Sequence, residues 1–268
     1  DNWNILWTDP LKLIADRKLK PHQLVNHIPS LSLSLHTHDT KFTLRAFQLP
    51  HMKHELNDYV SRNPHKRFII KGCLVDGVKV DASTINLDAS LVVQEYLEEN
   101  PLLIDDYRFD FGVFFLVSSA DPLRIYRYKG DIMSRFGRES SKSLKYFCEE
   151  LTTPAFEIPS LSEYINVRGY SIKNAMEEYL IKSGINMTLI YDRIDDAVVK
   201  FLLTKLRAMK KPSSNFIQLM RFDFNLDTKM NVHMKHVESA INFEGNEQLL
   251  YDALRLVGAA NTYEFKSR

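Results

Sequence analysis

Apolar and polar residues alternate, with a turn between two runs, in two stretches of the chain. The first covers residues 108–119, RFDFGVFFLVSS, and 123–130, LRIYRYKG, with the turn-forming pair Asp121-Pro122 between them. The second, residues 221–242, alternates in the same way and turns near residues 227–229. A period of two is that of a half-buried strand, and a turn between two such runs joins them as a hairpin. The pattern therefore predicts two β-hairpins.

Shorter segments complete an α+β pattern. Compact apolar runs predict further strands at 3–7, 67–72, 77–80 and the start of 91–103, and alternation in LSLSLHTH predicts another at 31–38. Apolar residues at helical spacing predict helices at 50–63, 141–151, 159–167, 171–183, 193–210 and 245–258. Strands come first, helices follow, and a hairpin with a helix ends the chain. This order favours antiparallel sheets with added helices.

Composition sets limits without naming a function. The 268 residues are enough for a sizeable core, and a net charge of +1 gives no reason to expect nucleic acid as a partner. No run of about 18 apolar residues occurs, so we expect no membrane span. Two cysteines do not make a disulfide framework. The chain starts with Asp1, so we allow for a missing signal or anchor, and Asn186 opens a glycosylation sequon.

Polar side chains interrupt otherwise apolar strands. Lys71, Gln94, Arg108, Asp110 and Asp223 each stand in or beside a hydrophobic run. Any one of them is compatible with an edge-strand group that reaches solvent, because buried charges need partners. Together they combine cations, which bind phosphates, with carboxylates, which bind Mg²⁺. A nucleoside triphosphate site is therefore the first functional hypothesis.

A long motif in the same region resembles a known family. Residues 92–137 contain QEY at the end of a strand, then NPLLI, RFD, a hydrophobic strand and DPLRIY. With RFIIKG at 67–72 and MRFDFNLD at 220–227, this block resembles the tubulin tyrosine ligase-like family. The opening WNILW is similar to the start of the polyglutamylase-type members.

The resemblance implies a fold and a chemistry. It implies an ATP-grasp fold, in which ATP lies between two α+β subdomains, here at 41–97 and 98–268, after a short N-terminal segment at 1–40. Enzymes of the family activate a carboxylate as an acyl phosphate, which an amine then attacks. They add tyrosine, glutamate or glycine to tubulin, and ATP and Mg²⁺ are the implied cofactors.

The resemblance assigns five residues to cofactor binding. Lys71 matches a lysine on the ATP phosphates. Gln94 matches a residue near the adenine, and the backbone of Leu97 lies where it would pair with the base. Arg108 stands where the family usually has lysine, so the charge is kept while the donor geometry differs. Asp110 matches the family's aspartate.

The catalytic and metal positions carry the main departure. Arg135 matches an arginine after the hairpin and is the catalytic candidate, and Asp223 matches a Mg²⁺ ligand. The family ends the returning strand with Glu-x-Asn, whereas this chain has His236 and Glu238. Magnesium prefers oxygen ligands and binds imidazole poorly. Glu238 is therefore the candidate that would share the metal with Asp223.

Expected cations are replaced as well. Asp76 stands where active members have an arginine, and Gly112 stands where many have one, two residues after the matched aspartate. The segments near 30–42 and 72–90 are shorter than in the family, so residues absent there would explain part of the difference. Loss of one charge-assisted contact at a transition state costs about 2–4 kcal/mol. Several losses together indicate a degenerate active site.

Two functions stay open at this point. One is an ATP- and Mg²⁺-dependent ligase that adds glutamate to a protein, and the other is a pseudoenzyme of the same fold that binds tubulin or another acidic protein. We expect a monomer in the cytoplasm, associated with microtubules, with a secretory lumen as the alternative because of Asn186. Basic residues near the end of the helix predicted at 193–210 complement its dipole or dock an acidic tail. They are Lys205, Arg207, Lys210 and Lys211.

Overall fold

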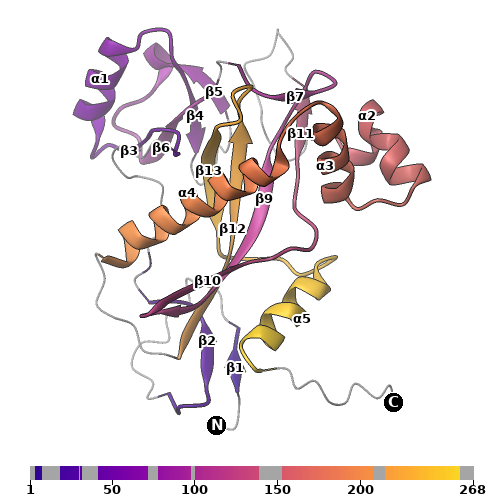
Figure 1. Cartoon of the computed structure of the whole chain (residues 1–268). Helices are drawn as coiled ribbons and strands as arrows, with labels where there is room; N and C mark the ends of the chain where they lie inside the picture. Colours follow the sequence, from indigo (N-terminus) through magenta and orange to yellow (C-terminus); the bar gives the residue numbers. More distant parts are fainter. Residues whose placement is uncertain are drawn as a thin grey trace.

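The computed structural model describes residues 4–7, 19–29, 31, 42–71, 78–97, 100–138, 153–207 and 215–259. These residues form three sheets with helices packed around them, a mixed α/β architecture (Figure 1). The helix expected at 141–151, most of the strand expected at 31–38, Asp76, Lys210 and Lys211 lie outside the described residues.

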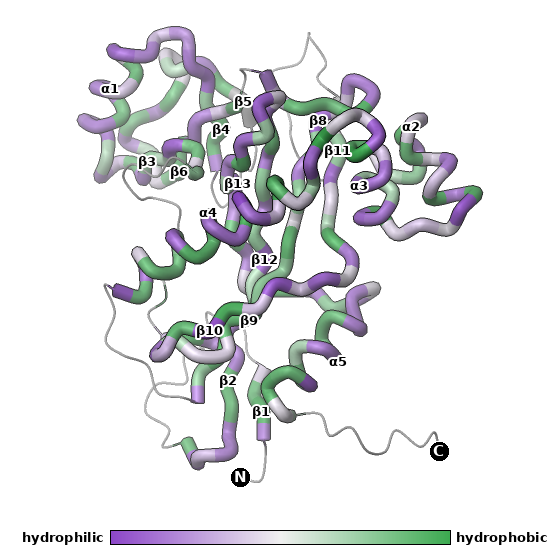
Figure 2. The backbone as a smooth tube through the Cα atoms, viewed as in Figure 1, coloured by the Kyte–Doolittle hydropathy of each residue, from purple (hydrophilic) through white to green (hydrophobic). Residues whose placement is uncertain are grey.

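The central sheet is built on two long antiparallel strands, β9 (Phe111–Ala120) and β12 (Phe216–Leu226). β10 (Leu123–Arg127) pairs with β9, and β13 (Val232–Glu238) pairs with β12, both antiparallel. Both hairpins predicted from the alternation are therefore confirmed. Figure 2 shows apolar residues running along the central strands.

The N-terminal strands join this same sheet. β1 (Ile5–Leu6) pairs in parallel with β2 (Leu24–Asn26), and β2 pairs in parallel with the start of β12. The segment expected at 1–40 thus contributes strands to the sheet that contains β12. The subdomain boundaries at residues 40 and 97 stay predictions.

A second, antiparallel sheet has the strand order β3-β6-β4-β5 and carries helix α1. A separate apolar cluster holds it together, in which Phe47, Phe68 and Val93 pack with Leu56 of the helix. The helix confirms the one predicted at 50–63. The bounds are β3 (Ala46–Leu49), β6 (Leu91–Glu95), β4 (Arg67–Lys71), β5 (Val78–Asp81) and α1 (Lys53–Arg62).

A third sheet, in the order β11-β8-β7, lies where the chain approaches β9. Asp110 separates β8 from β9, and its backbone N–H donates to the carbonyl of Arg135 at 3.2 Å. Gly112 and Met133 exchange two backbone hydrogen bonds, at 2.6 and 3.0 Å. The segment 133–135 is thereby fixed beside residues 110–112. The strands are β7 (Leu103–Ile104), β8 (Tyr107–Phe109) and β11 (Phe136–Arg138).

Helices cover the two faces of the central sheet. On one face the main apolar core contains Phe115, Phe222 and Phe224 together with α3 (Ile172–Lys182) and α4 (Met187–Arg207). On the opposite face, α5 (Glu247–Leu256) packs against β9 and β12. Among the described helices, none has the length and apolar character needed to span a membrane. The shorter helical segments are η1 (Ala82–Thr84), η3 (Ala155–Glu157), α2 (Pro159–Ser162) and the π-helical η4 (Glu163–Val167).

Helix α4 (Met187–Arg207) confirms the helix predicted at 193–210 over its described part, but it begins six residues before the predicted start, so the predicted start is wrong. Met187, Ile190 and Ile194 are all buried, which means that the apolar face continues toward the N-terminus. Asn186 then caps the helix, because its Oδ1 accepts a hydrogen bond from the N–H of Leu189 at 3.1 Å. Packing of the first two turns, rather than the run of charged residues after them, decides where the helix starts.

Candidate functional site

A charged cluster occupies the face of the central sheet opposite the main core. Along β12, Phe222 and Phe224 belong to that core, while Arg221 and Asp223, one residue out of phase, lie on the other face. The cluster and α5 therefore share this second face of the sheet. Gly112 of β9 is the direct partner of Asp223 in the strand pairing.

Asp223 is almost fully buried, at 1 % exposure, and both of its carboxylate oxygens are bonded to arginines. Arg221 donates from Nε to Oδ1 at 2.7 Å and from Nη2 to Oδ2 at 3.0 Å. Arg135 donates from Nη2 to Oδ2 at 2.8 Å. A buried carboxylate needs such partners, because removing its charge from water is costly.

Asp110, at 3 % exposure, is the second buried carboxylate of the cluster. Arg135 donates to its Oδ2 from Nε at 3.1 Å and Nη2 at 2.8 Å, and Lys235 donates from Nζ at 2.9 Å. Burial alone would raise the pKa of Asp110. The charges and hydrogen bonds of Lys235 and Arg135 outweigh burial and lower that pKa below its ordinary value. Arg135 therefore bridges both carboxylates, and Asp110 stays ionised.

Lys235 reaches the cluster through an irregularity in β13. Asp223 pairs with His236, while the next residue, Phe224, pairs with Met234, so that Lys235 is an extra residue on its strand. Such a β-bulge re-aims the side chain that it carries. The carbonyl of Lys235 also accepts a hydrogen bond from Nζ of Lys71 at 2.9 Å. That bond places the end of β4, from the smaller sheet, beside the cluster.

The carboxylate of Glu238 contacts residues at the C-terminal end of β13. Glu238 is paired with Arg221 across the hairpin, but its Oε1 accepts from the N–H groups of Ser239 and Ala240, both at 2.8 Å. Its Oε2 lies 3.5 Å from Nε2 of His236. The hydrogen bond from His236 and those from the two backbone N–H groups lower the pKa of Glu238 to about 2, against the opposing effect of burial.

The donor set does not fit a magnesium ion. Magnesium requires near-octahedral oxygen coordination, and the oxygens of Asp223 and Asp110 are bonded to cations of the chain. Across the described residues, the structure contains no group of three or more His, Cys, Asp or Glu side chains that could hold a metal. The assignment of Asp223 and Glu238 as metal ligands stays a prediction that this arrangement does not favour.

Three of the expected cofactor residues make contacts with residues outside the charged cluster. Gln94, at 1 % exposure, sits on β6 and donates from Nε2 to the carbonyl of Leu44 at 3.3 Å. Arg108 donates to the carbonyl of Leu97 and stacks over the ring of Tyr96, 4.6 Å from its centroid. Arg108 and Leu97 are thus brought together, and Arg108 ties the link after β6 to β8. Their roles toward a nucleotide stay predictions.

Arg221, like Lys235, is a cluster residue that the sequence pattern does not single out. A Cβ atom on Gly112 would lie 2.9 Å from Cδ of Arg221, 2.9 Å from Oδ1 of Asp223 and 3.0 Å from Cβ of Met133. The space above Gly112, where the family resemblance leads one to expect an arginine, is therefore filled by Arg221. The sequence holds a signal for it, because Arg221 and Asp223 are two residues apart on one strand and must share a face.

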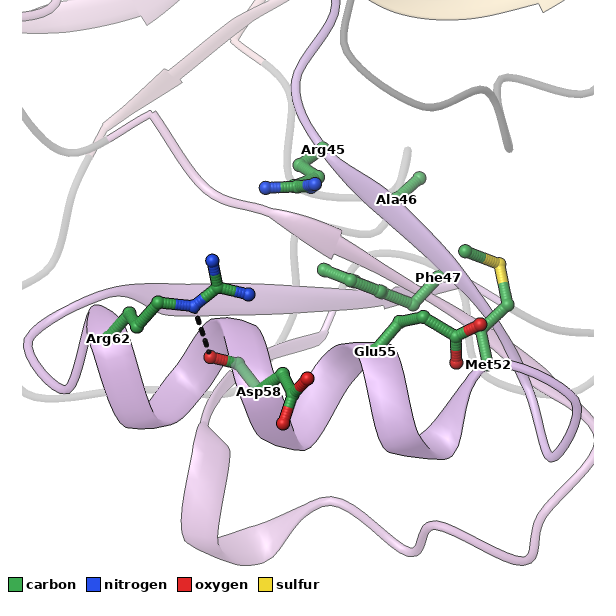
Figure 3. Close-up of a pocket in the computed structure, with 7 residues that line it drawn as sticks. All are labelled: Arg45, Ala46, Phe47, Met52, Glu55, Asp58 and Arg62. Carbon is green, nitrogen blue, oxygen red and sulfur yellow. Dashed lines mark hydrogen bonds between the residues drawn. The ribbon is translucent and has the colours of Figure 1, made fainter.

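A small pocket lies elsewhere, between α1 and the start of β3 (Figure 3). Figure 3 shows Nε of Arg62 donating to the backbone oxygen of Asp58, at 3.0 Å. The cavity, of about 110 Å³, is smaller than pockets that enclose cofactors, which run to about 300–1,000 Å³. None of the expected site residues lines it. Its lining is Arg45, Ala46, Phe47, Met52, Glu55, Asp58 and Arg62.

Comparison with known proteins gives one family. Residues 3–240 match the model of the tubulin-tyrosine ligase family. The "Probable tubulin polyglutamylase ttll-15" of Caenorhabditis elegans is 30% identical over 93% of this chain and 54% of its own length. "Tubulin polyglutamylase TTLL6" of Mus musculus is 27% identical over 97% of this chain and 37% of its own length. The chain spans about half or less of these relatives.

Proposed function

The chain belongs to the tubulin-tyrosine ligase family, and we propose that it keeps the family's nucleotide site but has lost efficient ligase chemistry. The family implies an ATP-grasp fold and uses ATP and Mg²⁺. In this proposal the protein is a pseudoenzyme that binds tubulin or another acidic protein. Bound ATP would supply the phosphoryl group that activates a carboxylate, and the described residues around Asp223 do not offer the oxygen donors that the metal of that step requires.

The ion pairs of Asp223 with Arg135 and Arg221 are the main support for the proposed loss of ligase activity. The carboxylate of Asp223 is 1 % exposed and is held by Arg221 and Arg135, so a metal ion would have to displace a guanidinium from a buried acid. Breaking a buried ion pair costs about 3–5 kcal/mol. His236 stands opposite Asp223, where an oxygen ligand would be needed, and imidazole is a poor ligand for magnesium.

A second candidate is a working, divergent polyglutamylase. Arg135, Asp110 and Asp223 remain in direct contact, with Lys71 hydrogen-bonded to the neighbouring strand, and this favours it. The 30% identity to a protein named as a probable polyglutamylase supports it too. In this reading Arg135 is the catalytic residue, whose guanidinium stabilises the charge that develops on the transferred phosphoryl group.

The partner and the compartment belong to the proposal as well. The relatives are named as tubulin polyglutamylases, which supports tubulin as the partner and the cytoplasm, at microtubules, as the location. Lys205 and Arg207 occupy the last described turn of α4, where they can meet an acidic tail. Asn186 is exposed, and glycosidase treatment of the native protein tests the alternative of a secretory lumen. An unchanged electrophoretic mobility supports the cytoplasm.

The deciding experiment is a ligation assay. The purified chain is incubated with tubulin, ATP, Mg²⁺ and labelled glutamate, beside an active tubulin polyglutamylase as the positive control. We expect incorporation no higher than in a sample without enzyme. Incorporation that Arg135→Met abolishes would establish the working ligase instead.

A restoring variant identifies which change disables the site. His236→Glu combined with Glu238→Asn returns the family's metal-ligand pair to β13. If those two positions are the lesion, the double variant gains incorporation that the parent chain lacks. A double variant as inactive as the parent would place the lesion outside these two positions.

A further inference from the structure

We propose that Arg221 and Lys235 are built-in cations that do the charge-neutralising work of magnesium, so that a nucleoside triphosphate binds this site without a metal ion. The inference rests on the proposed function, because it assumes that the nucleotide site is retained. It goes further in naming the ionic form of the ligand and the residues that replace the metal. It concerns binding only.

The charge balance of the cluster is the first argument. Two carboxylates, Asp110 and Asp223, are in contact with three cations, Arg135, Arg221 and Lys235. Counted over these five described residues alone, the formal charges sum to +1. A site whose carboxylates are metal ligands has a net negative charge without its metal, and it repels phosphate until the metal binds. This site attracts phosphate as it stands.

The second argument is that both cations are placed by local features of the backbone. The bulge opposite Asp223 and Phe224 inserts Lys235 and directs its ammonium to Asp110. Gly112, with no side chain, leaves the space that Arg221 fills. Two separate features of the backbone, the bulge on β13 and Gly112 on β9, thus place positively charged side chains beside Asp110 and Asp223.

Access is the third argument. The side chains of Lys235 and Arg135 are 20% and 21% exposed, and that of Arg221 is 13% exposed, although the carboxylates beneath them are nearly closed off. The cations therefore form the outer layer of the cluster. An ammonium has three donors, so Lys235 can bind Asp110 and a phosphate oxygen together. Lys71, expected on the phosphates, bonds to the carbonyl of the same Lys235.

The test is titration calorimetry of the whole chain with ATP, once in EDTA and once in excess Mg²⁺. We expect dissociation constants that agree within about threefold, since the metal adds little where cations are already present. Binding at least tenfold tighter with Mg²⁺, or no binding in either buffer, would overturn the inference.

A lysine variant with a matched control tests the assignment of residues. Lys235→Met keeps the length of the side chain and removes its charge, and should weaken ATP binding in EDTA about 10- to 100-fold. Lys229→Met makes the same change at an exposed position in the turn of the same hairpin and should leave binding unchanged. Thermal unfolding confirms that both variants are folded. Equal ATP affinities for the two variants would refute the role of Lys235.

The calorimetry and the ligation assay test two separate claims, and either claim can be overturned while the other stands. Magnesium-dependent ATP binding without glutamate incorporation would overturn metal-free binding and leave the loss of ligase chemistry standing. Glutamate incorporation would overturn the proposed loss, whatever the calorimetry shows about Mg²⁺.

Discussion

On one face of β12, Phe222 packs against Phe115 and Phe201, while one residue along, on the other face, Asp223 is held by two arginines. Both side chains are buried to 1 % exposure or less. The aromatic face is held together by burial and dispersion, which depend less on direction than ion pairs do. The charged face is stable only if every charge meets its partner. The two faces should therefore respond differently to the same kind of truncation.

The largest effect should come from the aromatic face. The ring of Phe222 lies 5.6 Å from that of Phe115 and 5.8 Å from that of Phe201, both edge-to-face. Phe222→Ala removes these contacts and leaves a cavity, so we expect a loss of about 3–5 kcal/mol in unfolding free energy. Urea denaturation measures it. Phe156→Ala, at a side chain that is 50% exposed, should change stability by less than about 0.5 kcal/mol.

The charged face should come next. Arg221→Met keeps much of the side-chain volume over Gly112 but leaves Asp223 with Arg135 alone. We expect a loss of about 3 kcal/mol, the lower end of the range for breaking a buried pair, because Arg135 still neutralises the acid. Arg124→Met on β10, an exposed arginine of the same sheet, is the control and should be nearly neutral. Equal losses in the two variants would show that the bond to Asp223 adds no stability.

The aromatic face is also the part that the sequence predicts best. An apolar run followed by the pair Asp121-Pro122 predicts the hairpin of β9 and β10, and alternation predicts that of β12 and β13. A period of two assigns each residue to a face with no knowledge of its partners. The start of α4 was misplaced because the charged residues after Asp192 hide an apolar face that continues through Ile190 and Met187.

The charged face depends on facts that no single segment contains. No residue pattern in β13 predicts the bulge at Lys235, because the extra residue is defined only by the pairing with β12. The family resemblance assigns no role to Arg221, and the place of this residue in the cluster depends on Gly112 on a different strand. Arg135, Asp110 and Asp223 were named from the family motif, and the structure brings them together. Their chemical roles stay predictions.

The close approach over Gly112 gives a smaller and sharper test of the charged face. Gly112→Ala places a Cβ 2.9 Å from Cδ of Arg221, which should cost about 1–3 kcal/mol through overpacking. With Arg221→Ala in the background, that contact is gone and the alanine should cost less. Oδ1 of Asp223 and Cβ of Met133 stay close, so relief should be partial. A double-mutant cycle in urea measures the coupling, which we expect at about 0.5–3 kcal/mol. Additive losses would mean that Arg221 does not occupy this space.

The smallest effect should be the pH dependence at the edge of the charged face. The pKa of Glu238 is lowered to about 2 from an ordinary value of 4.5, so the folded protein holds this carboxylate ionised more strongly than the unfolded chain does. Its contribution to stability is fully present above about pH 4.5 and is lost as the pH falls toward 2. The side chain is 34% exposed, and Gln can still accept from the backbone N–H groups of Ser239 and Ala240, so Glu238→Gln should have a modest effect at neutral pH. Urea unfolding of both proteins between pH 7 and pH 2.5 should show the difference between them shrinking with acid. A difference in unfolding free energy that stays constant across that range would mean that ionisation of Glu238 does not contribute to stability.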